Sequence, residues 1–393
     1  MRLKAGQMKS VTILGASGSI GTNALAFLRQ HREDFTLKAA SFARSWEAAV
    51  AIYREFTPES VAFTDEAAAA AFRDAVGSQC QVISGPRASA TIAAMPTDVV
   101  LAAISGSAGL PSVLAAVKAG NQVALANKEA LVCGGTKLLA LAEHHAVEVI
   151  PVDSEHSAIF QCMKLGRRDE LRRIVLTASG GPFRDWTREQ IARATPDEAL
   201  KHPNWQMGPK NSLDSATMAN KGLELIEACY FYDLPQDRVT TLINPSTLLH
   251  SAVSFVDGST IGLLSYNDMK NAIGYALAYP KRMSIGMDDL DLGQVGKLEF
   301  RPVDMERFPC LLLARQAVDA GPGATMMFNA ANEVAGALFM AGRINFYGIS
   351  DVISETLAGD TTQFDVPLDD LVEADHAAKA TATLIGERFA RPV

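Results

Sequence analysis

Short apolar runs recur between residue 10 and about residue 150, and longer alanine-rich stretches with helical periodicity lie between them. The runs are typical of β-strands because they are short and rich in valine, isoleucine and phenylalanine. Strands that alternate with helices pair in parallel, so the pattern predicts an α/β fold with helices on both faces of a parallel sheet. The predicted strands are VTILG, LKAASFA, SVAFT, DVVLAAI, QVALA and VEVIPV.

The pattern changes twice in the rest of the chain. Longer polar loops appear after residue 150, between strands such as RRIVLTAS and VTTLI, and this indicates a second region. An acidic, weakly periodic stretch then precedes a helical pattern that begins at Cys310, and we interpret that stretch as a linker or a long ordered loop. The predicted domains are 1–150, 151–286 and 310–393, with 287–309 as the linker.

Composition narrows the class of protein. Of 393 residues, 48% are hydrophobic, which is enough to build a large core, and the net charge of −8 gives no general attraction to nucleic acid or anionic membranes. The five cysteines are scattered, which argues against a disulfide scaffold or structural zinc and favours a reducing, cytoplasmic compartment. We expect neither a membrane span nor a secretory signal. Met1 and Met8 are both candidate start residues.

Three glycines follow the first predicted strand and precede a helix. Gly15, Gly18 and Gly21 have the spacing of a turn that lets the backbone approach a pyrophosphate, while the helix N-terminus supplies N–H groups. Ser17 and Ser19 add hydroxyl donors. A plain tight turn is the alternative, but the position at the first strand–helix junction favours a dinucleotide site.

The end of the second predicted strand bears on which dinucleotide binds. A carboxylate there would bind the ribose 2′-hydroxyl of NAD, but LKAASFARSW ends in Arg44 and Ser45 without an acid. A guanidinium suits a 2′-phosphate, so we predict NADPH as the cofactor. The alternative is that Arg44 is an ordinary surface arginine.

A set of acidic residues is the second candidate site. Asp153 and Glu155 follow a predicted strand, and residues two apart in an extended segment face the same way, which suits Mg²⁺ or Mn²⁺. Alternatively, Asp153 or Ser154 caps a helix that begins near His156, and Glu155 favours its positive end. Glu224 is a possible third ligand, although an ordinary helix face would also explain it.

The stretch DSATMANKGLELIEA, residues 214–228, is predicted to be mostly one helix, with Asp214 or Ser215 as its cap. Asn220 and Glu224 are four residues apart and therefore share a face. Hydroxyl, amide and ammonium groups near a helix start suit a phosphate, although each also has an ordinary explanation as a turn, loop or core residue. The candidates for this third, polar site are Ser179, His202, Trp205, Ser215, Asn220 and Lys221.

Six segments together resemble the 1-deoxy-D-xylulose 5-phosphate reductoisomerase family. They are VTILGASGSIG, LANKEALV, PVDSEHSAIFQ, TASGGPFR, HPNWQMGPKNSLDSATMANKGLE and NAANEVAGALF. The resemblance implies a cytoplasmic homodimer with an N-terminal Rossmann-like NADPH domain, an α/β catalytic domain and a C-terminal helical domain. It also implies an NADP-dependent oxidoreductase of the non-mevalonate isoprenoid precursor pathway. The expected reaction rearranges 1-deoxy-D-xylulose 5-phosphate and then reduces it to 2-C-methyl-D-erythritol 4-phosphate.

The same resemblance implies a role for each residue in the matching motifs. Metal binding is expected from Asp153, Glu155 and Glu224. Phosphate binding is expected from Ser179, Ser215, Asn220 and Lys221. Sugar or metal-bound oxygens would contact Lys128, Ser154, Glu155, His202 and Glu224, with Lys128, Glu155 and His202 as catalytic residues. Trp205 would close over the substrate from a mobile loop near 202–212. NADPH would contact Ser17, Gly18, Ser19, Ile20, Ala43, Arg44, Ser45, Asn127, Glu129 and Gly208.

The sequence departs from the family pattern at three places. Ala43 replaces a usual glycine, Asn244-Pro245-Ser246 replaces HPQS, and Ala272 replaces a proline. The first weakens the expected cofactor turn slightly, and the others concern packing or dimer contacts. Two other classes, a plain NADP-dependent dehydrogenase and an inactive dinucleotide sensor, remain as alternatives. Neither explains why three acids and a phosphate site would be kept.

Overall fold

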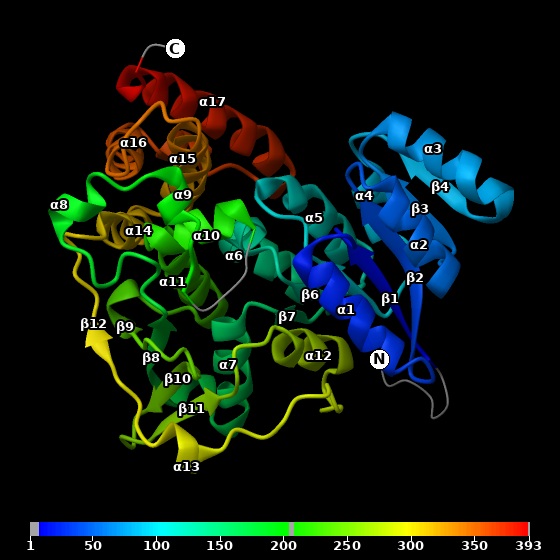
Figure 1. The fold of residues 1–393 in the computed structure, drawn as a ribbon, viewed down its shortest axis with the longest axis horizontal. Coiled ribbons are helices and arrows are strands. Elements are labelled where there is room, and N and C mark those ends of the chain that lie inside the picture. Colours follow the sequence, from blue (N-terminus) through cyan, green and yellow to red (C-terminus); the bar gives the residue numbers. More distant parts are fainter. Residues whose placement is uncertain (1–7, 204–207, 392–393) are drawn as a thin grey trace. The chain divides into compact units, whose positions relative to one another are not determined.

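The computed structural model describes residues 8–203 and 208–391, and these form two compact units (Figure 1). The first unit contains the described residues up to Ala130, together with Lys137–Ser157 and Asp268–Asp288. The second contains Leu131–Thr136, Ala158–Asn267 and the residues from Asp289 onward. The C-terminal helices therefore group with the second sheet. The finer division at residues 150, 286 and 309 remains a prediction.

The first unit is built on a seven-stranded parallel sheet with the order β4-β3-β2-β1-β5-β6-β7. The strand order reverses at β1, whose neighbours are β2 and β5, and ligands of such sheets bind beyond the strand carboxyl ends at this point. The strands are β1 (Lys9–Leu14), β2 (Phe35–Phe42), β3 (Ser60–Phe63), β4 (Gln81–Ser84), β5 (Val99–Ala102), β6 (Gln122–Leu125) and β7 (Val149–Pro151).

All six strands predicted for this sheet are present, and β4 is the one strand of the sheet that was not predicted. The missed strand lies at the edge of the sheet and starts with the exposed Gln81, so its apolar pattern is weak. The central strand β1 buries Val11, Ile13 and Leu14 completely, which explains its clear signal. The helices are α1 (Ser19–Gln30), α2 (Trp46–Phe56), α3 (Glu66–Val76), α4 (Ala88–Ala93), α5 (Leu110–Lys118), α6 (Lys128–His144), α7 (Ser154–Cys162) and α12 (Lys270–Ala278), with 3₁₀ turns at Gly77–Gln79 and Ser107–Gly109. Leu131–Thr136 of α6 and the part of α7 from Ala158 onward belong to the second unit.

A late segment of the chain, α12, returns to the first unit and packs on α1, β6 and β7. Its C-terminal carbonyls are held by Lys9 at the start of β1, whose Nζ donates to Leu277 O at 2.9 Å and Tyr279 O at 3.2 Å. A cation at a helix C-terminus is favourable. Burial nevertheless lowers the pKa of Lys9 to about 8, against the opposing charges of Asp98 and Glu148.

The second unit contains a five-stranded sheet with the order β11-β10-β8-β9-β12. The central pair β8–β9 is parallel and the other pairs are antiparallel, so the sheet is mixed. The strands are β8 (Leu171–Ala178), β9 (Val239–Ile243), β10 (Leu249–Phe255), β11 (Thr260–Leu264) and β12 (Arg301–Pro302).

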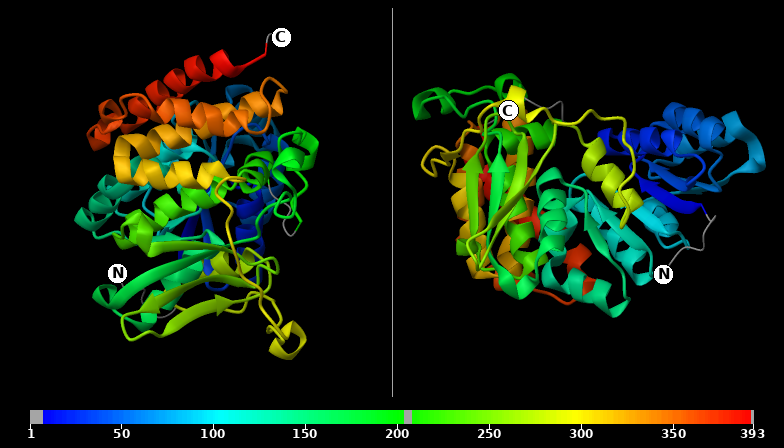
Figure 2. Two further views of the ribbon diagram at one scale, coloured as in Figure 1. Left: turned by 90° about the vertical axis from the view of Figure 1, so that its left-hand side faces the viewer. Right: turned by 90° about the horizontal axis from the view of Figure 1, so that it is seen from below.

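Helices complete the second unit. The chain from Cys310 onward is helical, as predicted, and Figure 2 shows these helices, gold to red, stacked on one another. Helix α15 contacts α14, α16 and α17 and buries Phe328 and Phe339. The helices are α8 (Arg188–Ile191), α9 (Pro196–Ala199), α10 (Pro209–Ala216), α11 (Ala219–Tyr232), α13 (Leu292–Val295), α14 (Pro309–Ala320), α15 (Pro322–Met340), α16 (Gly348–Leu357) and α17 (Leu371–Phe389), with 3₁₀ turns at Met163–Leu165, Arg168–Glu170, Gln236–Arg238, Thr362–Phe364 and Leu368–Asp370.

The acidic stretch before Cys310 is tied to the second sheet at several points. Arg301 pairs with Ile243 of β9 and forms an ion pair with Asp185 at 2.8 Å. The buried Asn244 donates from Nδ2 to Glu299 O at 2.8 Å. These contacts support the interpretation of the stretch as a long ordered loop.

None of the helices in the described part of the chain is both long and apolar enough to cross a membrane.

Candidate active site

The glycine turn after β1 is shaped by close backbone contacts. Gly15 has a φ of +81°, and a Cβ on it would lie 2.8 Å from Ala103 O, directly after β5. A Cβ on Gly21 would lie 2.5 Å from Gly15 O. Ser41 Oγ, at the end of β2, accepts from Gly15 N at 3.0 Å. Side chains at these glycines would therefore collide with backbone at the point where the strand order reverses.

The start of α1 faces this turn and suits an anion. Its N-cap residue is Gly18, which has no side chain to occupy the cap position, so the first N–H groups of the helix are left for a ligand. Ser17, Gly18 and Ser19 are exposed, and Ile20 is half-buried. These four consecutive residues, predicted to contact NADPH, therefore lie at the start of α1.

The loop between β2 and α2 carries the predicted ribose contacts, Ala43, Arg44 and Ser45, all exposed. The side chain of Arg44 is 86% exposed, and its Nε lies 3.5 Å from Asp65 Oδ2. Asp65 is also the N-cap of α3, where it accepts from Ala68 N at 2.8 Å. The sequence did not single out this acid because it follows the third strand, whereas a ribose-binding acid is expected after the second.

Asn127 begins α6 as its N-cap and is buried. Its Oδ1 accepts from Ala130 N at 2.9 Å, and its Nδ2 donates to Gly106 O at 2.8 Å and to Ile104 O. Its side-chain amide therefore fixes the turn after β5. The next two residues are also buried: Lys128 forms an ion pair with Asp153, and Glu129 lies 3.3 Å from Asn127 Nδ2.

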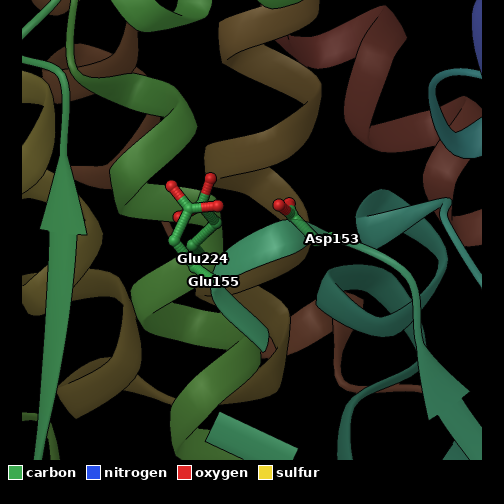
Figure 3. Close-up of side chains that lie close together, drawn as sticks. All are labelled: Asp153, Glu155 and Glu224. Atoms are coloured by element: carbon green, nitrogen blue, oxygen red, sulfur yellow. The ribbon is translucent and has the colours of Figure 1, made fainter. Parts of the chain in front are cut away.

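The three predicted metal ligands lie together, as Figure 3 shows. One carboxylate oxygen from each of Asp153, Glu155 and Glu224 lies within 4.8 Å of the other two. Like charges this close repel one another and attract a cation, and an all-oxygen site suits Mg²⁺ or Mn²⁺.

The local geometry at Glu155 differs from the expectation. Strand β7 ends at Pro151 and α7 begins at Ser154, so Glu155 lies in the first turn of a helix and not in an extended segment. Ser157 N donates to Asp153 O at 2.7 Å, which starts the helix, and Ser154 Oγ donates to Glu155. A helix start is present beside the acidic group, but it lies at Ser154 and not near His156, so Ser154 is inside the helix and does not cap it.

Most of residues 214–228 is helical, as predicted, but the predicted helix start at Asp214 or Ser215 was wrong. Helix α10 ends at Ala216 and α11 begins at Ala219, because Met218 adopts a left-handed conformation with a φ of +61°. Thr217 Oγ1 accepts from Ala219 N at 3.2 Å, and such local side-chain bonds compete with helix continuation. Asp214 and Ser215 consequently lie in the last turn of α10 and cap nothing.

The first two turns of α11 gather three buried or half-buried polar groups. Asn220 Nδ2 donates to one carboxylate oxygen of Glu224, and Lys221 Nζ donates to the other. The side chains of Lys221 and Glu224 are 4% and 1% exposed. The predicted shared face of Asn220 and Glu224 is therefore present, and an ammonium group lies on it too.

A glycine turn after β8 brings the remaining polar candidates together. Ser179 Oγ lies 2.9 Å from His202 Nε2 and accepts from Gly181 N at 3.1 Å. Gly181 has a φ of +66°, and a Cβ on it would lie 2.6 Å from Ser215 O. Ser179, His202 and Ser215 therefore lie around one turn, whose close approach requires glycine.

Burial, and secondly the charge of Arg184, lowers the pKa of His202 to about 4. The imidazole is therefore neutral near pH 7 and can share a proton with Ser179. Arg184 Nη1 also donates to Ser179 O at 3.2 Å. Sequence reasoning missed this arginine, although it ends the quoted motif TASGGPFR. Trp205 lies outside the described residues, and Gly208 is the exposed N-cap of α10.

Comparisons with known proteins cover nearly the whole chain. The model described as 1-deoxy-D-xylulose 5-phosphate reductoisomerase matches residues 11–135, and two models described as C-terminal domains of this enzyme match 149–232 and 264–381. A protein of that name from Chlorobium phaeobacteroides is 41% identical over 97% of this chain and 100% of its own length. One from Rhodospirillum centenum is 44% identical over 96% of this chain and 94% of its own length.

The chain belongs to the 1-deoxy-D-xylulose 5-phosphate reductoisomerase family.

Solved structures of the family confirm the predicted α/β fold class with its C-terminal helices. A DOX-P reductoisomerase in complex with NADPH, fosmidomycin and magnesium superimposes with a TM-score of 0.92 at 37% identity, covering 97% of this chain and 98% of that one. The enzyme from Zymomonas mobilis in complex with NADPH gives a TM-score of 0.89 at 36% identity, covering 97% and 100% of the two chains.

The three departures from the reductoisomerase pattern occupy different environments. Ala43 is exposed beside Arg44, so the loss of a glycine there meets no crowding. Asn244 is fully buried, and its amide bonds to Glu299 O and accepts from Ser246 Oγ at 3.2 Å. Ala272 is buried in α12. The two interior departures are thus accommodated by packing and hydrogen bonds.

The environment of His202 leads to a prediction about its titration. We expect His202 to stay neutral down to pH 5, because its pKa lies near 4 and not near 6.5. Removing the neighbouring cation in Arg184→Met should raise the pKa towards the ordinary value. Nitrogen-15 NMR of the imidazole between pH 7 and pH 5 measures both. Arg188→Met, which removes an exposed arginine of α8, is the control, and a midpoint near 6.5 in the parent would contradict the assignment.

Proposed function

We propose that this chain converts 1-deoxy-D-xylulose 5-phosphate to 2-C-methyl-D-erythritol 4-phosphate with NADPH, in isoprenoid precursor synthesis. The carbon skeleton is rearranged first, and the resulting aldehyde is then reduced. The full-length family match supports this reaction. The observation that carries it is the group of Asp153, Glu155 and Glu224, since a simple dehydrogenase has no use for such a cation site.

Asp153, Glu155 and Glu224 would hold Mg²⁺ or Mn²⁺. Such an ion, when bound, polarises the ketone carbonyl and a neighbouring hydroxyl of the substrate. Lys128 contributes a cation at the same place through its ion pair with Asp153. It is our candidate for moving the proton of a sugar hydroxyl, with Glu155 and His202 as further catalytic residues. Ser154 binds the sugar beside them.

Ser179, Ser215, Asn220 and Lys221 would hold the substrate phosphate. The approach of Gly181 to Ser215 O supports a common site for the two serines, and the adjacent start of α11 contributes the amide and the ammonium. In this structure Lys221 Nζ is bonded to Glu224. Phosphate binding at Lys221 and metal binding at Glu224 are therefore expected to influence each other.

NADPH would bind on the first unit. The turn of Gly18 and the exposed Ser17 and Ser19 suit its pyrophosphate, and Arg44 suits its 2′-phosphate. Ile20, Ala43 and Ser45 would line the site, with further contacts from Asn127, Glu129 and Gly208. NADPH, when bound, supplies the hydride for the reduction. Trp205 would exclude water from the substrate when the loop near 202–212 closes.

The active protein is expected to be a cytoplasmic homodimer. All five cysteines are buried thiols, which supports a reducing compartment. Strand β11 lies at an edge of the second sheet; its last residue, Leu264, is 38% exposed and Tyr266, two residues later, is 40% exposed. An edge strand with apolar side chains is suited to pairing with another chain. Light scattering should give about twice the chain mass of 42.0 kDa.

The proposed reaction is tested by following NADPH oxidation with 1-deoxy-D-xylulose 5-phosphate after chelation and after re-addition of Mn²⁺. We expect oxidation only with both the substrate and the metal. Oxidation of NADPH by simple ketones without metal would favour a plain dehydrogenase. Binding of NADPH without turnover under any of these conditions would favour an inactive sensor.

Arg44 should make NADPH the preferred cofactor. We expect kcat/KM for NADPH to exceed that for NADH by at least about tenfold, which corresponds to about 1.4 kcal/mol. Arg44→Ala should remove most of this preference, because its guanidinium is the cation at the end of β2. Steady-state kinetics with both cofactors measure the ratio. A preference that survives in Arg44→Ala would place the 2′-phosphate contact elsewhere.

Glu224→Gln should abolish metal-dependent turnover while the fold persists. The amide keeps the shape of the side chain but removes one of three negative charges from the site. Calorimetric titration with Mn²⁺ and circular dichroism separate metal affinity from folding. Glu227→Gln, the same change one turn later in α11, is the matched control and should retain Mn²⁺ binding. A near-parental kcat in Glu224→Gln would show that Glu224 is an ordinary acidic residue of the helix and not a metal ligand.

Lys221→Ala should lower kcat as well as raise KM. Binding energy from the unreacting phosphate can hold the reacting end of the substrate in place. We expect kcat/KM to fall by roughly 3 kcal/mol, the cost of leaving a buried charge unpaired. The dephosphorylated substrate is the control, and it should be poor and nearly indifferent to the change. Equal losses on both substrates would show that Lys221 acts at the metal or in the fold.

A further inference from the structure

Helix α15 carries a polar face of buried and half-buried groups that the proposed reaction does not use. This face belongs to the motif NAANEVAGALF and to the turn before it, in an otherwise apolar helix. Each of its groups bonds to a different element of the second unit: Thr325 to Tyr230 OH of α11 at 2.7 Å, Asn329 to Cys133 Sγ at 3.7 Å, Asn332 to Asp214 of α10 at 2.9 Å, and Glu333 to Lys379 of α17 at 2.7 Å.

Of these bonds, the one from Asn332 reaches α10, the helix that carries the predicted phosphate ligand Ser215. Asn332 Nδ2 donates to Asp214 Oδ1 at 2.9 Å, and Lys210 Nζ donates to Asp214 Oδ2 at 2.7 Å. Asn332 is 2% exposed and Asp214 is 3% exposed. A carboxylate this deeply buried needs bonding partners, and Asn332 and Lys210 provide one for each of its oxygens.

Packing beside this bond brings the two helices close together. One turn after Asn332, a Cβ on Gly336 would lie 3.3 Å from Leu213 Cδ2, and Leu213 is itself buried. Helix α10 has only eight residues, so its position depends on tertiary contacts more than on its own stability. Leu213 and Asp214 are neighbours in the chain, and both contact α15. Together the two contacts fix where α10 lies along α15 and which side of α10 faces it.

The position of α10 matters for the candidate phosphate site because of Ser215. Ser215 comes directly after Asp214, and its carbonyl lies against the glycine turn that holds Ser179. Any displacement of the last turn of α10 therefore changes the distance between the two serines and moves the start of α11, which follows after the break at Met218.

We propose that Asn332 is a positioning residue for the substrate phosphate. Through Asp214 it holds the last turn of α10, so that Ser215 and the Ser179 turn bind one phosphate group together. This inference rests on the proposed phosphate site and deepens it. Asn332 itself does not touch the substrate.

The test measures binding of inorganic phosphate to the full-length protein by calorimetry, and its competitive inhibition of turnover. Asn332→Leu keeps the number and branching of the side-chain heavy atoms but removes the amide. We expect its dissociation and inhibition constants for phosphate to rise at least fivefold, with NADPH affinity within twofold of the parent. Unchanged phosphate binding in a folded Asn332→Leu protein would overturn the proposal. Calorimetry needs no turnover. An inactive parent protein would therefore contradict the proposed reaction, while the calorimetric comparison would still test the role of Asn332.

Two further variants separate positioning from a general loosening of α15. Thr325 lies on α15 like Asn332, and Thr325→Val removes its hydrogen bond to Tyr230 of α11. This variant should leave phosphate binding within twofold of the parent. A loss as large as that of Asn332→Leu would overturn the proposal.

The second comparison exchanges the amide and the carboxylate between positions 332 and 214. Asn332→Asp alone sets two carboxylates against each other, so phosphate binding should weaken further as the pH rises and recover as it falls. Adding Asp214→Asn lets the new amide donate to the new carboxylate and accept from Lys210. The double variant should bind phosphate within twofold of the parent. A double variant no better than Asn332→Asp would overturn the role of this bond.

Discussion

Mutual repulsion among Asp153, Glu155 and Glu224 is the constraint around which the candidate site is organised. Three carboxylates with oxygens within 4.8 Å of one another are costly to bring together, and the fold offsets this cost with fixed cations. Lys128 pairs with Asp153, and Lys221 pairs with Glu224. The same side chains that balance the acids are those expected to meet the substrate. The charge balance of the folded protein and its proposed chemistry therefore depend on one set of groups.

The helical region beyond Cys310 does more than fill the core of the second unit. Helix α15 forms hydrogen bonds with α10 and α11 through buried side chains. Such bonds require both partners in one arrangement, because a buried polar group without a partner is costly. The short helix α10, the left-handed break at Met218 and the start of α11 are thereby held in place, and the proposed phosphate site depends on this support.

Local patterns in the chain predicted many features correctly. The strands of the first sheet, except β4, follow from buried apolar runs, and the turn at Gly15 follows from glycine spacing. Other features escaped because their causes are not local. The break at Met218 occurs inside a favourable helical pattern, and the helical position of Glu155 depends on where β7 ends. Arg184 became relevant only through its distance from Ser179.

The sequence by itself determined the α/β class, the glycine turn after the first strand and the identity of the polar groups, because each depends on residues that are neighbours in the chain. The tertiary structure decided which of these groups meet. Asp214 and Asn332 are 118 positions apart, and no periodicity or motif spacing connects them. Glu224 likewise reaches Asp153 only when the chain has folded. Contacts across such separations depend on the packing of whole helices, and this is the physical reason why sequence patterns could not predict them.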